Sequence, residues 1–235
     1  MADDAGIPAA EPQLLKADAF GRVERRHSTD ASGGPLSWVR RDAHAARWWL
    51  RPLARALAAR EARALSRLAG QAGVPALLAR ARAGLDRSWI EGQPMHRARP
   101  AQPAYFQRAL CLVARLHRRG VTHNDLAKEP NWLVTPQGHP ALVDFQLASC
   151  WGRRGRCFRL QAREDLRHLL KHKRSYCPQS LTARERALLA RPSLAARLWR
   201  WLFKPPYRLV TRGLLGWADR EGAGDRGGAP PGLSP

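Results

Sequence analysis

The side chains best suited to chemistry lie in one stretch, residues 121–148, with the sequence VTHNDLAKEPNWLVTPQGHPALVDFQLA. Short apolar segments on either side of Pro136-Gln137-Gly138 predict a hairpin that begins after Asn131 and returns through Asp144. The loop before this hairpin carries Asp125, so two carboxylates and one amide come to the same end of the ribbon. These hard oxygen ligands suit Mg²⁺ with a bound polyphosphate. A carboxylate left free of the metal can accept a proton from an attacking hydroxyl.

This stretch resembles the protein-kinase-like superfamily. His123-Asn124-Asp125 followed by Asn131 is similar to its catalytic-loop pattern, and Val143-Asp144-Phe145-Gln146 is similar to its metal-binding DFG element. The resemblance implies that Asp125 orients or deprotonates the acceptor hydroxyl, and that Asn131 and Asp144 hold Mg²⁺ on ATP. It also implies that His123 supports the loop backbone. Two further residues take expected roles: Lys128 supplies charge to the transferred phosphoryl group, and Asp165 braces the loop.

The upstream part of the chain offers candidates for nucleotide binding. Glu61 lies where the superfamily's first long helix carries its ion-pairing glutamate, and Glu91 belongs to a Trp-Ile-Glu-Gly segment at the expected hinge. Gly21 is placed at the turn of the first hairpin. The third strand has no lysine, so Arg40 or Arg41 must pair with Glu61. Alternation along a strand puts Val39 with Arg41 and slightly favours Arg41, whereas alignment by motif shape slightly favours Arg40.

Several departures narrow the resemblance. Five residues (LAKEP) separate Asp125 from Asn131, a spacing more like bacterial lipopolysaccharide-core sugar kinases. The third residue of the DFG-like element is Gln146, which lacks the backbone freedom of glycine. There is no GxGxxG loop, and the chain after Asp144 lacks an APE-like anchor. With its short segment after Asp144, the chain is similar to compact RIO-type and sugar-directed kinases.

The surrounding pattern predicts an α+β protein with a two-lobed, kinase-like fold. The expected small N-lobe holds a sheet and a long helix, and the short C-lobe is mainly helical. Expected strands are Leu14–Ala19, Arg22–Arg26, Leu36–Asp42, 85–90, Trp132–Val134 and Ala141–Phe145. Expected helices are 45–69, divided or restarted by Pro52, then 103–119, 161–172, 182–190 and 193–202. The expected divisions are a flexible tail at 1–13, the N-lobe at 14–91, the C-lobe at 92–218 and a disordered tail at 219–235.

Composition limits the partners. The chain has 235 residues with 41 Lys plus Arg against 19 Asp plus Glu, a net charge of +22 that favours anionic partners. No known nucleic-acid motif accompanies this charge, so nucleic acid is not the expected partner. The segment 194–217 mixes tryptophans with cationic residues and is typical either of a packed helix or of attachment to an anionic membrane surface.

The cysteines and the N-terminus bear on location. Cys111, Cys150, Cys157 and Cys177 are too scattered for a disulfide scaffold, so a reducing compartment is expected. A zinc site from the last three of these with His168 and His172 is an alternative, though no CxxC pair supports it. The acidic N-terminal segment lacks the order of a secretory signal. We therefore expect a cytoplasmic protein, with the inner membrane face as a candidate peripheral site.

These observations predict an ATP-dependent, Ser/Thr-protein-kinase-like phosphotransferase with Mg²⁺. The acceptor hydroxyl belongs either to a protein Ser/Thr or to a sugar of an envelope glycolipid. The alternative is a catalytically weak, nucleotide-binding pseudokinase scaffold, which the missing lysine and glycines favour.

Overall fold

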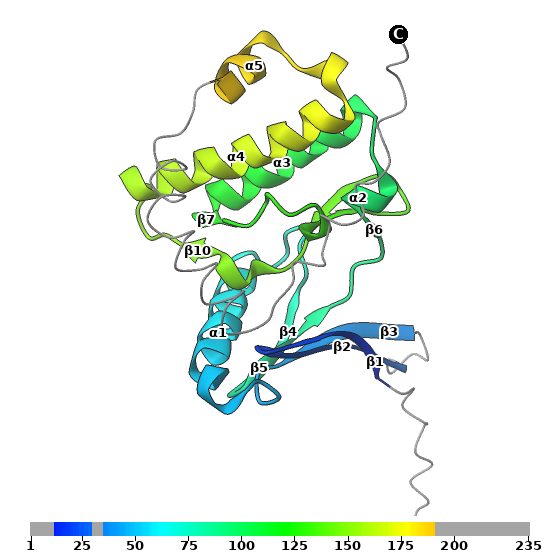
Figure 1. Cartoon of the computed structure of the whole chain (residues 1–235), viewed down its shortest axis with the longest axis vertical. Helices are drawn as coiled ribbons and strands as arrows, with labels where there is room; N and C mark the ends of the chain where they lie inside the picture. Colours follow the sequence, from blue (N-terminus) through cyan, green and yellow to red (C-terminus); the bar gives the residue numbers. More distant parts are fainter. Residues whose placement is uncertain (1–11, 30–34, 191–235) are drawn as a thin grey trace, which may run out of the picture. The chain divides into compact units, whose positions relative to one another are not determined.

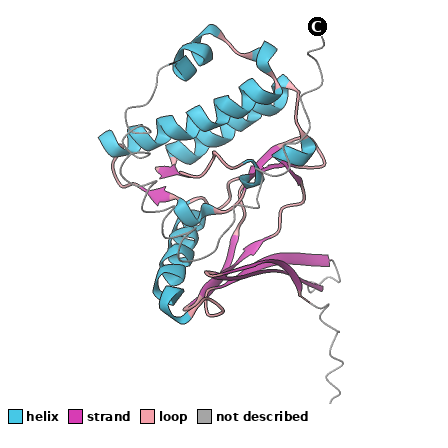
Figure 2. Ribbon diagram, in the orientation of Figure 1, coloured by secondary structure: helices cyan, strands magenta, loops and turns pink. Residues whose placement is uncertain are grey.

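The computed structural model describes residues 12–29 and 35–190, which form a mixed α and β structure (Figures 1 and 2). The described chain forms two compact units. The first runs to Ile90 and includes Asp144–Ala148, whereas the second comprises Glu91–Val143 and continues from Ser149. The expected lobe boundary after residue 91 lies next to this division, but the short return of 144–148 to the first unit was not expected.

The first unit contains a five-stranded antiparallel sheet in the order β1-β2-β3-β5-β4. The strands are β1 (Gln13–Asp18), β2 (Gly21–Thr29), β3 (Pro35–Asp42), β4 (Leu77–Ala81) and β5 (Gly84–Ser88). The first turn consists of Ala19 and Phe20 instead of the expected Phe20 and Gly21, because the Asp18 carboxylate accepts a hydrogen bond from the Phe20 amide at 2.8 Å.

Helix α1 (Arg51–Arg67) is rich in alanine, the strongest helix former, and contains Pro52 in its first turn, where its missing N–H costs nothing. It follows the 3-10 turn η1 (Trp48–Leu50), so the expected division of this segment at Pro52 is confirmed. The buried face of α1 repeats at helical spacing through Ala54, Ala58 and Leu65. Small side chains there let the helix pack closely, and Glu61 lies on the same buried face. The helix contacts β5 and the 3-10 turn η3 (Phe145–Leu147).

The second unit is mainly helical. Its helices are α2 (Met95–Ala98), α3 (Pro103–Arg118), α4 (Arg156–Tyr176) and α5 (Ala183–Ala190), with 3-10 turns η2 (Glu129–Asn131) and η4 (Pro178–Ser180). Its strands are β6 (Gln93–Pro94), β7 (Val121–Thr122), β8 (Trp132–Val134), β9 (Pro140–Leu142) and β10 (Ser149–Cys150). Strands β6, β8 and β9 form one small sheet, and β7 pairs with β10.

The core of this unit lies where α3 packs on α4 and β9. Phe106, Leu116, Trp132, Leu142 and Leu169 are completely buried there. Burial of each such side chain contributes about 1.5–3 kcal/mol, so this packing fixes the ends of the loop between β7 and β8.

Three expectations about the elements are corrected. The second hairpin strand ends at Leu142 instead of Phe145, because Asp144 adopts left-handed backbone angles that a strand cannot contain (φ 64°, ψ 66°). Helix α4 begins at Arg156, after Gly155, and is longer than the expected 161–172. Strand β4 is absent from the expected strands, because four of its five residues are exposed and leave little apolar pattern to find.

Some expectations lie outside the described residues, namely the two tails, the helix 193–202 and the Trp-rich segment 194–217. None of the helices in residues 12–29 and 35–190 is long and apolar enough to cross a membrane.

Candidate functional site

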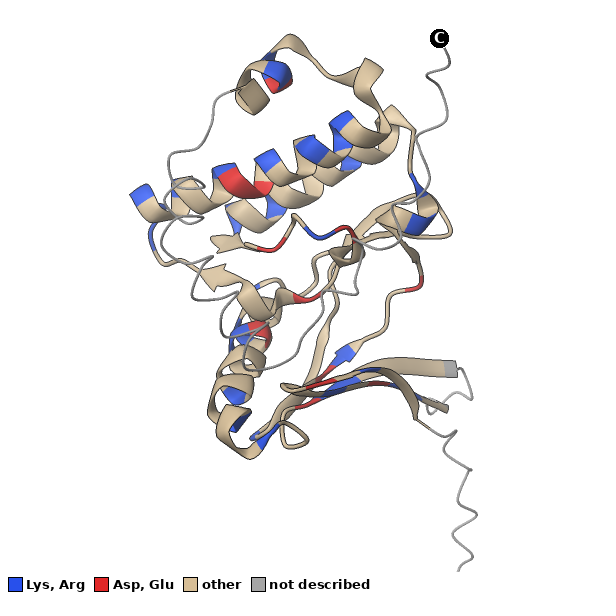
Figure 3. Cartoon of the chain, in the orientation of Figure 1, with Lys and Arg blue, Asp and Glu red and all other residues tan. Residues whose placement is uncertain are grey.

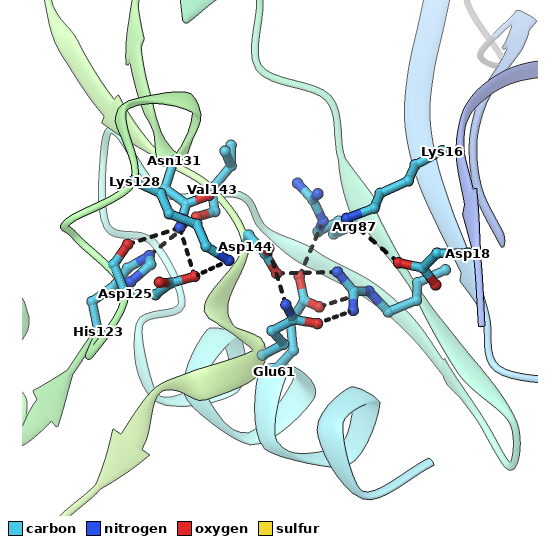
Figure 4. Close-up of polar contacts among 12 residues, drawn as sticks. Lys16, Asp18, Glu61, Arg87, His123, Asp125, Lys128, Asn131, Val143 and Asp144 are labelled. Carbon is cyan, nitrogen blue, oxygen red and sulfur yellow. Dashed lines mark hydrogen bonds and ion pairs between the residues drawn. The ribbon is translucent and has the colours of Figure 1, made fainter. Parts of the chain in front are cut away.

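The second unit places Asp125, Lys128 and Asn131 in mutual contact (Figure 4). The Asn131 Nδ2 atom donates to the Asp125 carbonyl at 2.9 Å and to its carboxylate Oδ2 at 3.1 Å. The Lys128 ammonium lies 3.0 Å from the same Oδ2, and its side chain is 45% exposed. We call these three residues the Asp125 cluster. It joins a buried acid, a buried amide and a cation that reaches solvent.

The amide of Asn131 is oriented by these bonds. Both of the hydrogen bonds recorded for its side chain are donated by Nδ2, so its carbonyl oxygen points elsewhere. The main-chain carbonyl of Asn131 accepts from the Val143 amide at 3.0 Å, which ties the end of η2 to the chain just before Asp144. The side chain is therefore held in one orientation with an oxygen available to a ligand.

The loop that carries Asp125 is fixed from α4 by one carboxylate. Asp165 is completely buried, and its two oxygens accept from the backbone amides of His123 and Asn124, each at 2.9 Å. His117 lies 3.0 Å from the same carboxylate. Asn124 has a left-handed backbone (φ 66°), a conformation that asparagine tolerates better than most residues. The bracing contact expected of Asp165 is present.

The His123 side chain bonds to Val143, outside the loop whose backbone it was expected to support. The side chain is buried, and Nε2 donates to the Val143 carbonyl at 3.0 Å. Val143 is thus bonded through its amide to Asn131 and through its carbonyl to His123. Asp144 is the next residue along the chain, so the backbone that leads into it is fixed at both polar groups.

The first unit resolves the choice between the two arginines of β3. Arg41 Nε lies 3.1 Å from Glu61 Oε2, and Arg41 Nη2 lies 3.1 Å from Asp144 Oδ1. Arg40 instead pairs with Asp86 directly opposite it on β5, at 2.6–2.8 Å. Alternation along β3 explains the difference, because neighbouring side chains point to opposite faces of the sheet. Arg41 therefore occupies the position that the sequence left open.

A second arginine, Arg87 of β5, completes this buried group. Its Nε lies 3.2 Å from Glu61 Oε1, so each oxygen of Glu61 faces one guanidinium. Glu61 is 0% exposed. We call Arg41, Glu61, Arg87 and Asp144 the Glu61 cluster. Figure 4 labels the last three of these residues. A carboxylate so deeply buried is tolerated only because opposite charges neutralise it.

Asp144 is held at the edge of that cluster by its own neighbour Gln146. The Gln146 amide donates to Asp144 Oδ2 at 3.3 Å, and its carbonyl oxygen accepts from Arg41 at 2.6 Å. Gln146 thus does what a glycine in this place cannot, since it fixes both the acid and the arginine. Burial lowers the pKa of the Arg41 guanidinium, but the charges of Glu61 and Asp144 outweigh it and the net pKa is raised.

The remaining predicted residues are placed as follows. Gly21 is buried at the start of β2 with φ 124°, and a Cβ there would lie 2.1 Å from the Asp42 carbonyl oxygen. The close approach of the β3 backbone therefore requires glycine at position 21. Glu91 is exposed, in the segment between β5 and β6. The structure brings neither into the contacts of the two clusters that it records.

Asn131 in the second unit and Asp144 in the first each carry an oxygen of the kind that Mg²⁺ binds. An amide oxygen and a carboxylate are the oxygen ligands that this ion takes together with phosphate and water. In residues 12–29 and 35–190, no group of three or more His, Cys, Asp or Glu side chains gathers as an all-protein metal cage. That result disfavours the zinc alternative, and His172, one of its candidate ligands, instead contacts the Leu126 carbonyl at 2.8 Å.

The sequence analysis missed Arg87, and it named Asn124 and Gln146 only as members of motifs, without the contacts that they make in the structure. The only signal for Arg87 was strand pairing: Val39 faces Arg87 across β3 and β5, which puts Arg87 on the same face as Arg41. That register could not be read before the strands were known. No protein-family model matches the chain, and no curated protein matches its sequence.

Proposed function

We propose that this protein is an ATP-dependent phosphotransferase that moves the γ-phosphoryl group of ATP to a hydroxyl acceptor. The acceptor class is a protein Ser/Thr or a sugar of a lipopolysaccharide-type glycolipid. The Asp125 cluster is the observation that carries the proposal. It couples a buried carboxylate to a fixed amide at 3.1 Å and to a solvent-reaching ammonium at 3.0 Å.

Each residue of that cluster has a role in the proposal. Asp125 orients the acceptor hydroxyl and receives its proton. Lys128 compensates the negative charge that spreads over the transferred group. Asn131 offers its amide oxygen, and Asp144 its carboxylate, to Mg²⁺, which neutralises charge on the phosphates when bound. Catalysis of this type is mostly positioning, and the bonds from Asp165 to the loop backbone supply that rigidity.

The Glu61 cluster gives Arg41 the part usually taken by a lysine. Glu61 and Asp144 fix the guanidinium from two sides, and its fork geometry suits the α- and β-phosphates of ATP. Arginine is always charged, so this interaction does not depend on pH in the physiological range.

The experiment is phosphoryl transfer from labelled ATP to a cell-envelope extract that is afterwards separated into protein and lipid fractions. The variants are Asp125→Asn and Asp144→Asn, and Asp86→Asn is the matched control because its carboxylate pairs only with Arg40 in the recorded contacts. We expect both test variants to lose at least about a hundredfold in rate, with the control close to wild type. Undiminished transfer in Asp125→Asn would refute the assigned role. The labelled fraction identifies the acceptor class.

One observation favours the alternative of a nucleotide-binding scaffold with little turnover. All three guanidinium nitrogens of Arg41 already have partners within the first unit, namely Glu61, Asp144 and Gln146. Arg41 must exchange one of them to reach a phosphate. Mg·ATP binding by equilibrium dialysis, without labelled product over the full extract, supports this alternative against the enzyme.

The scaffold alternative includes attachment to an anionic membrane surface, and η1 offers an observation for it. Trp48 is 78% exposed and Trp49 is 42% exposed, with the exposed Arg47 beside them. Tryptophan next to arginine is typical of segments at the lipid–water interface. Co-sedimentation with vesicles containing phosphatidylglycerol, compared between wild type and Trp48→Ala/Trp49→Ala, tests it. Equal binding by both proteins contradicts a role for this turn.

A further inference from the structure

The first unit contains a pocket of about 400 Å³ that the proposed phosphotransfer does not use. It is lined by Arg55, Ala58 and Ala59 of α1, by Arg80 and Ala81 of β4, and by Arg82 and Gly84 at the β4–β5 turn. The lining thus contains three arginines and no acid. The four other residues are alanine or glycine, whose small size leaves the space open.

In the part of the chain that the structure describes, the three pocket arginines have no recorded counter-charge, which distinguishes them from several other arginines of the first unit. Arg40, Arg41 and Arg87 each pair with a carboxylate. In contrast, the described part of the chain provides no ion pair or hydrogen bond to the side chains of Arg55, Arg80 or Arg82. Lysines and arginines are spread over many elements (Figure 3), so charge alone does not single out this place. What distinguishes this place is that three arginines without a recorded partner line one pocket.

The Arg55 side chain adds a second observation. Its Nε atom is buried and has no hydrogen-bond partner in the described structure. A buried donor without an acceptor costs about 1–3 kcal/mol in the protein without a ligand. The pocket therefore combines the half-buried Arg55 with the exposed arginines Arg80 and Arg82.

We propose that this pocket binds a small anion that carries two or more phosphoryl groups. Guanidinium groups bind phosphate oxygens through paired hydrogen bonds, which are stronger than neutral ones. Three arginines can neutralise more charge than one phosphate presents, and the volume exceeds that of a single phosphate group. A soluble polyphosphorylated metabolite and a phosphorylated lipid headgroup share this chemistry.

The test is calorimetric titration of the full chain with pyrophosphate in EDTA, so that no metal bridges the anion to another site. Arg55→Ala/Arg80→Ala/Arg82→Ala removes the three pocket charges, and Arg63→Ala/Arg153→Ala/Arg163→Ala is the control, because it removes the same charge at exposed positions. We expect binding to weaken at least about tenfold in the first and to stay near wild type in the second. Equal weakening in both, or no binding to wild type, overturns the proposal.

A third variant separates a shaped pocket from a diffuse positive field. Ala59→Phe fills the space and keeps all three arginines, so we expect it to lose pyrophosphate binding as well. Full binding by a folded Ala59→Phe protein contradicts the pocket. The same titration of Asp125→Asn/Asp144→Asn should retain binding, which keeps this result independent of the phosphotransferase proposal.

The source of the anion is identified by vesicles that contain phosphatidic acid. If pyrophosphate displaces the protein from them and the pocket variant fails to bind them, the site takes a lipid headgroup. If the pocket variant binds vesicles as wild type does while it loses pyrophosphate, the ligand is soluble.

Discussion

Replacement of Glu61 by glutamine tests the physical basis of the buried charge cluster. Glu61 is 0% exposed and balances two guanidinium groups at 3.1 and 3.2 Å. With an effective dielectric constant of about 20, each contact contributes about 5 kcal/mol of Coulomb attraction, most of which is offset by the cost of burying the ions. Loss of one member of a buried pair costs about 3–5 kcal/mol, because an uncompensated charge remains.

In Glu61→Gln the two arginines are affected differently. Arg41 keeps Asp144, whereas Arg87, whose side chain is 11% exposed, loses the acid that faces it. We therefore expect a loss of about 3 kcal/mol, near the lower end of the range, because glutamine still accepts one hydrogen bond. A second change, Arg87→Met, removes the uncompensated charge and keeps most of the volume, so the double variant should recover about 1–2 kcal/mol.

The assay is urea unfolding followed by circular dichroism, with the slope compared between variants so that a change in midpoint reports stability alone. Arg40→Ala is the control. Its ion pair with Asp86 is also short, but the Arg40 side chain is 42% exposed, so we expect a loss of about 1 kcal/mol or less. If Glu61→Gln costs no more than Arg40→Ala, or if Arg87→Met makes Glu61→Gln worse, the reasoning about buried charge is wrong.

Three further changes test other parts of the structure. Burial, followed by the charge of Lys171, lowers the pKa of His168 to about 4 from the usual 6.5, so the unfolded chain binds the proton more readily. The contribution of neutral His168 to the free energy of unfolding is complete above about pH 6.5 and decreases by up to about 3 kcal/mol as the pH falls towards 4. In His168→Gln, the free energy of unfolding should lack this part of its dependence on pH between 6.5 and 4. An unchanged pH dependence contradicts the prediction. Asp165→Asn leaves one backbone N–H of the Asp125 loop without an acceptor. It should lower the free energy of unfolding by about 2–3 kcal/mol, measured by thermal unfolding. An unchanged melting temperature excludes the bracing role. Tyr105→Phe removes a buried hydroxyl that donates to the Leu133 carbonyl at 3.1 Å. It should lower the free energy of unfolding by about 1 kcal/mol in the same measurement. A more stable variant would show that the bond is not formed.

Local pattern was sufficient for the elements whose sequence has a strong period or a strong terminator. The hairpin strand Trp132–Val134 and the helix that begins at Pro103 were predicted with nearly the observed bounds. Apolar spacing in the helix and the turn residues 136–138 in the hairpin carry that information within a few residues.

The features that the sequence did not predict depend on contacts between residues far apart in the chain. The sequence could not decide between Arg40 and Arg41, because the choice depends on which face of β3 meets Glu61. Arg87 could not be predicted for the same reason, because its partner Glu61 lies 26 positions earlier in the chain. The left-handed conformation of Asp144 could not be predicted either, because it is stabilised by tertiary bonds to Arg41 and is not favoured by local propensity.

Gly21 and Gly84 have a joint consequence for the mutational tolerance of the first unit. They flank the end of β3 from β2 and β5, and a Cβ on either would come within 2.1 Å of a carbonyl oxygen of Asp42 or Arg41. The backbone next to Arg41 therefore excludes side chains from both neighbouring strands. In a saturation-mutagenesis library, these two positions should reject every substitution, alanine included.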